Sequence, residues 1–168
     1  TADGQVKGVV LANSKQFLAD GVISSLPPSS LLKVLPEEAK TEPLRQKLKS
    51  FTFSPIISIN LWLDRVITDG LFVAMTGTRI QWLFNKPAIL RLTPLRQGSG
   101  GQAGIKAHYL SLIISAAYEF LGQSNAALVQ MAREDLEACF PQAKGVQVLR
   151  SQVVREREAT VSLDPETE

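Results

Sequence analysis

The sequence predicts an α+β fold, with an antiparallel or mixed sheet of about five to seven strands and helices packed on one face. Apolar residues make up 45% of the 168 residues and charged residues 20%, which is typical of a globular domain with its own core. Segments rich in β-branched and aromatic residues follow one another across short turns, which favours antiparallel pairing. One segment, residues 124–140, has helical periodicity.

The N-terminal part predicts a pair of strands. Residues 6–11 are apolar and β-branched, residues 13–16 have turn composition, and residues 17–26 supply a returning strand. Pro27 and Pro28 end this strand, because proline has no N–H to donate to a neighbouring strand.

Two helical segments are expected next. Ser29 or Ser30 can cap a short helix that runs to residue 35. Residues 36–51 predict a second helix, with acidic residues early and basic residues late, as the helix dipole favours. Pro43 lies inside this segment and is expected to divide it into two pieces.

Residues 51–64 form the longest predicted strand, because apolar side chains alternate along it. Pro55 indicates that this strand is an edge strand or contains a bulge. Further strands are expected at residues 71–75, 79–84, 88–93, 108–117 (running into a helical turn) and 145–163.

The clearest predicted helix is residues 124–140, with Ser124 as its cap. Cys139 falls in its apolar pattern and is expected to be a small buried hydrophobic residue. Because it is the only cysteine, a disulfide within the chain and a cysteine-based zinc cluster are excluded. The apolar positions of this pattern are Leu128, Met131, Ala132, Leu136 and Cys139.

Composition and motifs exclude several function classes. The net charge of +2 and the scattered basic residues give no electrostatic case for nucleic acid. No metal-binding spacing and no nucleophile elbow occurs, and no segment is long and apolar enough to span a membrane. Without a recognisable signal peptide, a cytoplasmic location is expected. The first residue is not Met and the last residues are polar, so we expect a piece of a longer protein.

The glycine-rich segment 97–104 fits the pattern G-x-G-x-x-G/A through Gly98, Gly100 and Ala103. A dinucleotide site requires a strand before this pattern and a helix after it. Here Pro94 interrupts the segment before it, and the residues after it resemble a strand. We therefore expect a flexible connection between strands, not a phosphate site.

Few side chains suggest chemistry of their own. His108, the only histidine, is conceivable as a general base, but no serine, cysteine or aspartate constellation accompanies it. Trp62, Trp82 and Phe84 lie in predicted strands, where a core position is the default. Trp82 and Phe84 share one face, with Gln81 on the other, so this surface could line an apolar ligand cavity. No catalytic residue and no metal ligand is assigned.

Several segments follow one another in a familiar order. The first is "DGQVKGVVLANSKQFLADGVISSLPPSSLLKVLPE". The others are "SPIISINLWLD", "IQWLFNK", "HYLSLIISAA" and "VVREREATVSL". Together they resemble FAD-dependent flavoproteins of the amine-oxidase kind, and most of all their squalene/phytoene desaturase branch, which includes hydroxysqualene dehydroxylases. Two departures stand out: residues 94–107 have no counterpart, and Ser25 replaces the alanine of many relatives.

The resemblance implies a division of the chain. Residues 1–28 would be a strand pair of the FAD-binding domain, residues 29–150 the substrate-binding domain, and residues 151–168 a returning strand with a polar tail. The N-terminal G-x-G-x-x-G and C-terminal Gly-Asp segments that hold FAD in this family do not occur in the chain. FAD is thus implied for the full-length protein, and none is expected in this fragment.

The resemblance also implies site residues. By motif match, the residues near the cofactor are Ser24, Ser25, Leu26 and Pro27, and those on the substrate-facing sheet are Gln81, Trp82 and Phe84. The implied function is part of an oxidoreductase acting on a long isoprenoid, inactive alone, with peripheral membrane contact possible. Two alternatives stay open: a stand-alone lipid- or protein-binding module, and an enzyme that uses His108 as its base.

Overall fold

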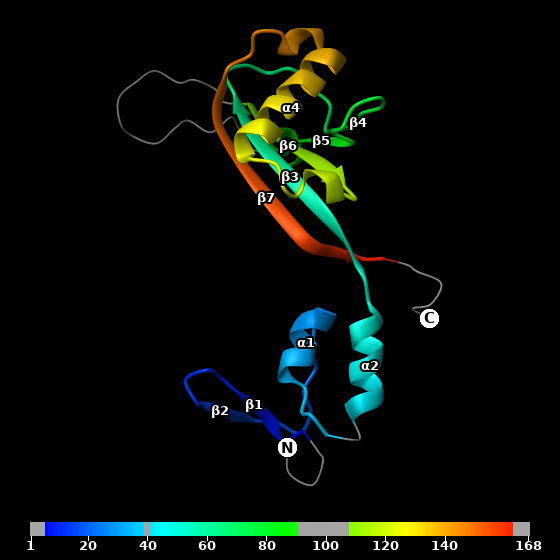
Figure 1. Cartoon of the computed structure of the whole chain (residues 1–168). Helices are drawn as coiled ribbons and strands as arrows, with labels where there is room; N and C mark the ends of the chain where they lie inside the picture. The colour runs from blue at the N-terminus through cyan, green and yellow to red at the C-terminus, as the bar shows by residue number, and fades with distance from the viewer. Residues whose placement is uncertain (1–5, 39–40, 91–107, 163–168) are drawn as a thin grey trace, which may run out of the picture. The chain divides into compact units, whose positions relative to one another are not determined.

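The structure is a computed structural model that describes residues 6–38, 41–90 and 108–162 (Figure 1). The chain divides into two compact units, one of residues 1–51 with 164–168 and one of residues 52–163. The second unit contains a five-stranded antiparallel sheet with a long helix against it, which confirms the predicted α+β class. The functions assigned above to three ranges of the chain stay predictions.

The first unit begins with a two-stranded antiparallel sheet, β1 (Gly8–Val10) and β2 (Gln16–Leu18). Gly8 has φ +147°, and a Cβ atom at this position would lie 2.0 Å from the carbonyl oxygen of Phe17. Only glycine allows β2 to approach β1 so closely. The returning strand expected at residues 17–26 is confirmed in part, because it already ends at Leu18.

Two short helices follow, and both start differently from the prediction. Helix α1 (Pro28–Val34) has Pro27 as its N-cap and no side-chain cap, so the expected serine capping is wrong: the serines lie inside the first turn. Helix α2 (Glu42–Ser50) starts well after residue 36, with Pro43 in its first turn. Proline is tolerated there because the first N–H groups of a helix have no partner, so the predicted division at Pro43 is wrong.

The five-stranded sheet has the order β4-β5-β6-β3-β7, and all of its neighbours are antiparallel. Strand β3 therefore lies inside the sheet, and β4 and β7 form its edges. The bounds are β3 Phe53–Leu63, β4 Phe72–Ala74, β5 Trp82–Asn85, β6 His108–Ser115 and β7 Val148–Val161.

Pro55 lies in β3, an interior strand of the sheet. The sequence predicted an edge strand or a bulge at this proline; the edge strand is wrong and the bulge is confirmed. The pairing of β3 with β7 shifts between Ser54 and Ile56, and residues 157–159 of β7 fall in the gap. The Pro55 carbonyl accepts a hydrogen bond from the Ala117 N–H, so the backbone of Pro55 faces the side of β6. Strand β6 ends at Ser115, so the missing N–H of Pro55 lies where the pairing of β3 with β6 has already ended.

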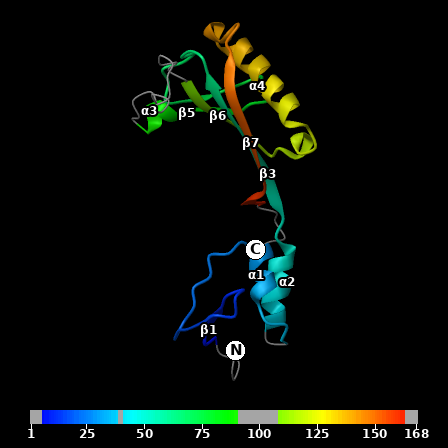
Figure 2. The same ribbon diagram turned by 90° about the vertical axis from the view of Figure 1, so that its left-hand side faces the viewer.

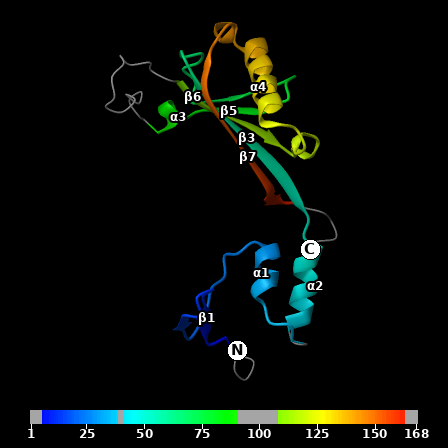
Figure 3. The ribbon, with the colours of Figure 1, turned by 60° about the vertical axis from the view of Figure 1, so that its left-hand side comes forward.

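Two shorter elements flank β5 and β6. Asn85 caps α3 (Lys86–Ile89) by accepting a hydrogen bond from the Ala88 N–H, so the strand expected at residues 88–93 is wrong at its beginning. Helix α3 lies beside β5 and β6 (Figure 3). The helical turn expected after β6 is confirmed as a 3-10 helix, Tyr118–Phe120, and a second 3-10 turn spans Pro141–Ala143.

Helix α4 (Asn125–Cys139) packs along one face of the sheet (Figure 2). Its predicted cap is confirmed, because the Ser124 side chain accepts a hydrogen bond from the Ala127 N–H. Cys139, expected in the core, is exposed, because it is the last residue of the helix, where the apolar face no longer meets the sheet. The helix packs on side chains that are at most 1% exposed: Ile57, Ile59, Leu61, Leu63, Leu83, Leu110, Leu112 and Ile114.

Candidate functional site

The other face of the sheet, here called the open face, differs in kind from the core face. Side chains of a strand alternate between the two faces, so the strand pairing assigns each residue to one of them. The open face contains Ile56, Ser58, Asn60 and Trp62 of β3, Tyr109, Ser111, Ile113 and Ser115 of β6, Trp82 and Phe84 of β5, Phe72 and Ala74 of β4, and Arg150, Gln152, Val154 and Glu156 of β7.

One end of the open face is aromatic and apolar. Trp82 is 40% exposed and Phe72 60% exposed, which is unusual for such large apolar side chains in the middle of a fold. The Trp82 and Phe84 rings stack with centroids 6.3 Å apart, and the Phe72 ring lies 6.4 Å from that of Trp82. Ile113 lies opposite Trp82 on β6 and extends this surface. Such a surface can hold an apolar ligand.

The opposite end of the open face combines aromatic and polar groups. The Trp62 and Tyr109 rings are parallel, with centroids 4.5 Å apart. The Arg150 guanidinium lies 4.8 Å from the centroid of the Trp62 ring, within reach of a cation–π interaction. The Tyr109 hydroxyl donates a hydrogen bond to Asn60 Oδ1 at 3.1 Å.

The three residues predicted for substrate contact lie next to one another, but they differ in what they offer. Trp82 and Phe84 share the open face, as predicted. The side-chain amide of Gln81 is already engaged by the backbone of Ser115: its Nε2 donates to the carbonyl oxygen, and its Oε1 accepts from the N–H at 3.0 Å. Gln81 therefore extends the pairing of β5 with β6, and the free surface comes from Trp82 and Phe84.

The residues predicted near a cofactor lie in the first unit, in the stretch between β2 and α1. This stretch has no regular secondary structure. Ser24, Ser25 and Leu26 are exposed, and Ser24 Oγ accepts a hydrogen bond from the Leu26 N–H at 3.4 Å. The Pro27 carbonyl accepts from the first turn of α1.

His108 lies at the start of β6 on the core face, not on the open face. It is 4% exposed, and its Nδ1 accepts a hydrogen bond from the Ile67 N–H at 3.3 Å. Burial lowers the pKa of His108, and the Asp69 carboxylate opposes this shift. The ring is thus held neutral, and within the described ranges its Nε2 has no hydrogen-bond partner. This environment is that of a buried core histidine.

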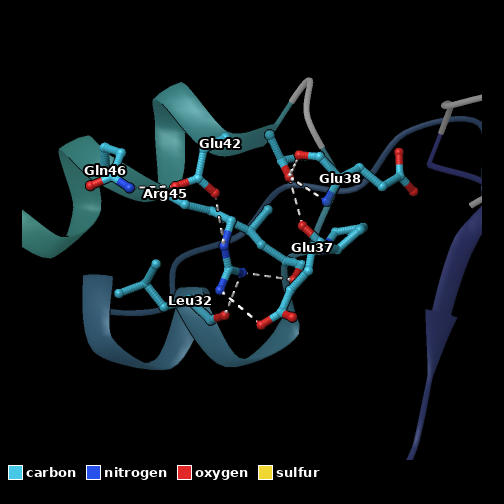
Figure 4. A network of polar contacts seen from close by, with 9 residues as sticks. Leu32, Glu37, Glu38, Glu42, Arg45 and Gln46 are labelled. Atoms are coloured by element: carbon cyan, nitrogen blue, oxygen red, sulfur yellow. Dashed lines mark hydrogen bonds and ion pairs between the residues drawn. The ribbon is translucent and has the colours of Figure 1, made fainter.

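A polar hollow of about 330 Å³ is lined by Glu37 and Glu38 of the segment before α2 and by Glu42, Arg45 and Lys49 of α2. Figure 4 shows the polar contacts of Arg45 with its neighbours there. Arg45 donates hydrogen bonds to the carbonyl oxygens of Leu32 and Leu35 and forms ion pairs with Glu37 and Glu42. Its guanidinium therefore satisfies carbonyls at the end of α1, and it joins the two helices. The role is structural.

A second network, which the sequence did not reveal, joins α4 to the segment before β5. Asp135 is 4% exposed, accepts hydrogen bonds from Arg79 and from the Ile80 N–H, and lies on the buried side of α4. An acidic residue within the apolar pattern of a helix signals a buried partner. That partner lies 56 positions away, so local patterns could not identify it.

The remaining sequence features concern phosphate, metal and membrane binding. The segment 97–104 with Gly98, Gly100 and Ala103 lies outside the described residues. Within the part of the chain that the structure describes, no group of three or more histidine, cysteine, aspartate or glutamate side chains could hold a metal ion. Among the described helices, none is long and apolar enough to cross a membrane.

A comparison with protein-family models identifies the family. The model described as flavin containing amine oxidoreductase matches residues 1–167, nearly the whole chain. The chain belongs to this family. The resemblance read from the sequence is thereby confirmed at the level of the family, and the family implies FAD for the complete protein.

Curated relatives in this family include 15-cis-phytoene desaturases. The enzyme of Solanum lycopersicum is 23% identical over 145 residues, which cover 83% of this chain and 23% of the relative. The enzyme of Synechococcus elongatus is 24% identical over 139 residues, which cover 82% of this chain and 27% of the relative. The chain thus spans about a quarter of the length of these relatives.

Solved structures share the fold. Reduced UDP-galactopyranose mutase gives a TM-score of 0.65 at 10% identity, over 91% of this chain and 32% of that one. An oxidoreductase from Methanosarcina mazei also gives 0.65, at 21% identity, over 93% of this chain and 35% of that one. At such identities the likeness establishes the fold alone.

Proposed function

We propose that the chain is the substrate-binding part of an FAD-dependent oxidoreductase that acts on a long isoprenoid of the phytoene or squalene kind. The observation that carries this proposal is the open face, where Trp82, Phe84 and Phe72 form one apolar surface that the described residues leave partly exposed. The 15-cis-phytoene desaturases among the relatives support an isoprenoid as the substrate class.

In such an enzyme, FAD would supply the redox chemistry by accepting or giving an electron pair. The residues of this chain would bind the isoprenoid along the open face, orient it and exclude water from it. This division of roles agrees with the lack of a catalytic constellation around His108, whose ring is buried and held neutral. The chain alone would then be inactive.

Residues 24–27 fit a place beside the cofactor. Ser24, Ser25 and Leu26 are exposed and outside any helix or strand. The Leu26 N–H already donates to Ser24 Oγ and the Pro27 carbonyl accepts from α1, so the main-chain groups of Ser24 and Ser25 are the ones that would hydrogen-bond a flavin. Among the described contacts of residues 24–27, the bond from the Leu26 N–H to Ser24 Oγ is the one hydrogen bond between a side chain and the backbone of this stretch. Peripheral membrane contact, which would give access to an apolar substrate, belongs to the same proposal.

A stand-alone lipid- or protein-binding module is the second candidate function. It is favoured by one observation: the whole open face lies within the compact unit of residues 52–163. FAD uptake by the longer polypeptide distinguishes the two candidates. A yellow protein with flavin absorbance supports the oxidoreductase, and a colourless protein that takes up no FAD supports the module.

The binding role is tested by titrating the chain with phytoene in nonionic detergent micelles and following tryptophan fluorescence. Both tryptophans of the sequence, Trp62 and Trp82, lie on the open face and report directly on its occupation. Phe84→Ala removes a ring at the centre of the apolar end and should weaken binding about tenfold.

Phe17→Ala is the matched control, because Phe17 is a half-exposed phenylalanine of the other unit. It should leave the affinity unchanged. Equal affinities of wild type and Phe84→Ala, with both proteins folded by circular dichroism, would count against the proposed function.

A further inference from the structure

The charge and polarity of the open face change along the strands. The strand pairing defines rows of residues across the sheet, and these rows can be compared. The first row contains Arg150, Trp62 and Tyr109. The following rows begin on β7 with Gln152 and Val154, and they end on β4. The second row is Gln152, Asn60, Ser111, Phe84 and Phe72, and the third is Val154, Ser58, Ile113, Trp82 and Ala74. The first row thus carries the cation Arg150 beside two aromatic rings, whereas the third row has no charged side chain.

The polar end carries two cations. Arg150 lies over the Trp62 ring, and the Nζ atom of Lys86 lies 5.9 Å from the centroid of the Phe84 ring. Lys86 directly follows Asn85, which pairs with Leu110, so it lies at the same end of the sheet as Tyr109. Neither cation forms an ion pair within the described residues 6–38, 41–90 and 108–162.

Nearby carboxylates do not balance the charge of Arg150. Asp64, which follows β3 at this end, is paired with Arg65 at 3.0 Å and accepts a hydrogen bond from the Gln147 N–H. Glu156 also lies on the open face, but it pairs with Ile56 at the opposite end of the strands. Asp69 follows Thr68, whose carbonyl oxygen accepts a hydrogen bond from Asn85 Nδ2, so this carboxylate lies on the Lys86 side of the sheet. Among the described residues no carboxylate forms an ion pair with Arg150, which favours an anionic ligand group there.

Neutral donors accompany the cations. Asn60 is 9% exposed, and its Oδ1 is engaged by the Tyr109 hydroxyl, so the Nδ2 donors remain. Within the described contacts Nδ2 has no partner. Asn60 lies one row from Arg150, and Gln152 lies opposite Asn60 on β7. A guanidinium and amide donors on one patch suit the oxygens of a carboxylate or phosphate.

We propose that the open face binds an amphipathic isoprenoid, with a carboxylate or phosphate head group at Arg150 and Asn60 and its apolar chain over Phe84, Trp82 and Ile113. The inference rests on the proposed function, because it takes the open face as the substrate site. From Trp62 to Ser58 is four residues of strand, or about 13 Å. A farnesyl chain covers such a distance, and an anionic head group at its end would accept hydrogen bonds from Arg150 and Asn60.

The test uses ligands with the same chain and different heads: farnesene, farnesol, farnesoic acid and farnesyl phosphate, below their micellar concentrations. Tryptophan fluorescence of the chain reports binding, and Trp82→Phe leaves Trp62 as the reporter at the polar end. The two anionic ligands should bind about tenfold more tightly than farnesol, and this advantage should shrink as salt is added.

Arg150→Met should remove most of the advantage of the anionic ligands and leave farnesol binding unchanged. Arg157→Met is the matched control, since Arg157 is an exposed arginine of the same strand in the bulge region. Lys86→Met, on the other side of β3 and β6 from Arg150, should keep most of the advantage, and circular dichroism confirms that each variant is folded.

Equal affinities for farnesoic acid, farnesyl phosphate and farnesol would overturn this inference while leaving the proposed function intact. Equal losses in Arg150→Met and Arg157→Met would overturn it as well. If none of the four ligands changes the fluorescence of either tryptophan, both the inference and the proposed function fail.

Discussion

The two faces of the five-stranded sheet are made by the same strands, yet they have opposite compositions. Toward α4, the strands present isoleucine and leucine side chains such as Ile59 and Leu112, which are fully buried. Away from it, the same strands present tryptophan, tyrosine, phenylalanine, serine and asparagine, several of them partly exposed. Alternation along a strand places these two sets back to back.

The core face therefore contributes to the stability of the fold, whereas the open face offers side chains to a ligand. Aliphatic side chains packed without exposure contribute most of the hydrophobic free energy of the unit. Exposed aromatic rings contribute less to folding, and they offer flat apolar surface with polar groups beside it to a ligand. Neighbouring residues of one strand can therefore be substituted to separate the two roles.

The largest expected effect comes from the neighbours Leu112 and Ile113 on β6. Leu112→Ala empties a fully buried site and should lower the free energy of unfolding by about 2–5 kcal/mol. Ile113→Ala lies on the open face, where the side chain is partly exposed, and should cost only about 1 kcal/mol. Urea denaturation of both variants, followed by circular dichroism, measures the difference.

Ile113→Ala should in turn weaken binding of phytoene, because Ile113 lies opposite Trp82. Equal losses of stability in the two variants would mean that the open face is packed as tightly as the core face, and the proposed separation of roles would be wrong.

A smaller effect is expected from pH, and it sharpens the assignment of His108 to the core. Burial lowers the pKa of His108 below its ordinary value of about 6.5, so below that pH the unfolded chain binds a proton that the folded chain does not. Stability should therefore fall as the pH falls from about 6.5 toward the folded pKa, and it should be constant above. Unfolding free energies at a series of pH values between 5 and 8 measure this slope.

His108→Asn can keep an acceptor for the Ile67 N–H but does not titrate, so it should remove the slope in this range. The pKa values of the Asp64 and Glu134 carboxyl groups are also lowered, so these groups titrate at a more acidic pH than His108. They do not disturb the comparison of wild type with His108→Asn between pH 5 and 8. A wild-type slope that persists in His108→Asn would show that another group causes it.

The sequence predicted elements whose patterns are local and repeated. Strand β3 follows from the alternation of Ile57, Ile59, Leu61 and Leu63, and helix α4 from its apolar spacing and its Ser124 cap. Patterns of this kind depend only on which side of an element faces the core.

The errors arose where an element depends on its ends or on distant partners. The sequence around Pro43 predicts a break, but the structure places this proline in the first turn of α2, where it is accommodated. Residues 88–93 predict a strand, but the Asn85 side chain caps the helix α3, which includes residues 88 and 89. Cys139 follows the helical period and is nevertheless exposed, because α4 ends at that residue.

For the candidate site, Trp82 and Phe84 could be placed on one face by strand alternation alone. Trp62, Tyr109 and Arg150 come from three different strands, and their stacking depends on a register that the sequence did not specify. The polar end of the open face therefore emerged only from the structure.

The most direct test of the central claim, that the open face is a ligand-binding surface, is acrylamide quenching of Trp62 and Trp82 in single-tryptophan variants. Each variant is measured in empty detergent micelles and in micelles that contain phytoene. Ligand bound on the open face should lower the quenching of both tryptophans, with the larger change at Trp82, which is 40% exposed. Quenching that is the same with and without phytoene at both positions would contradict the claim.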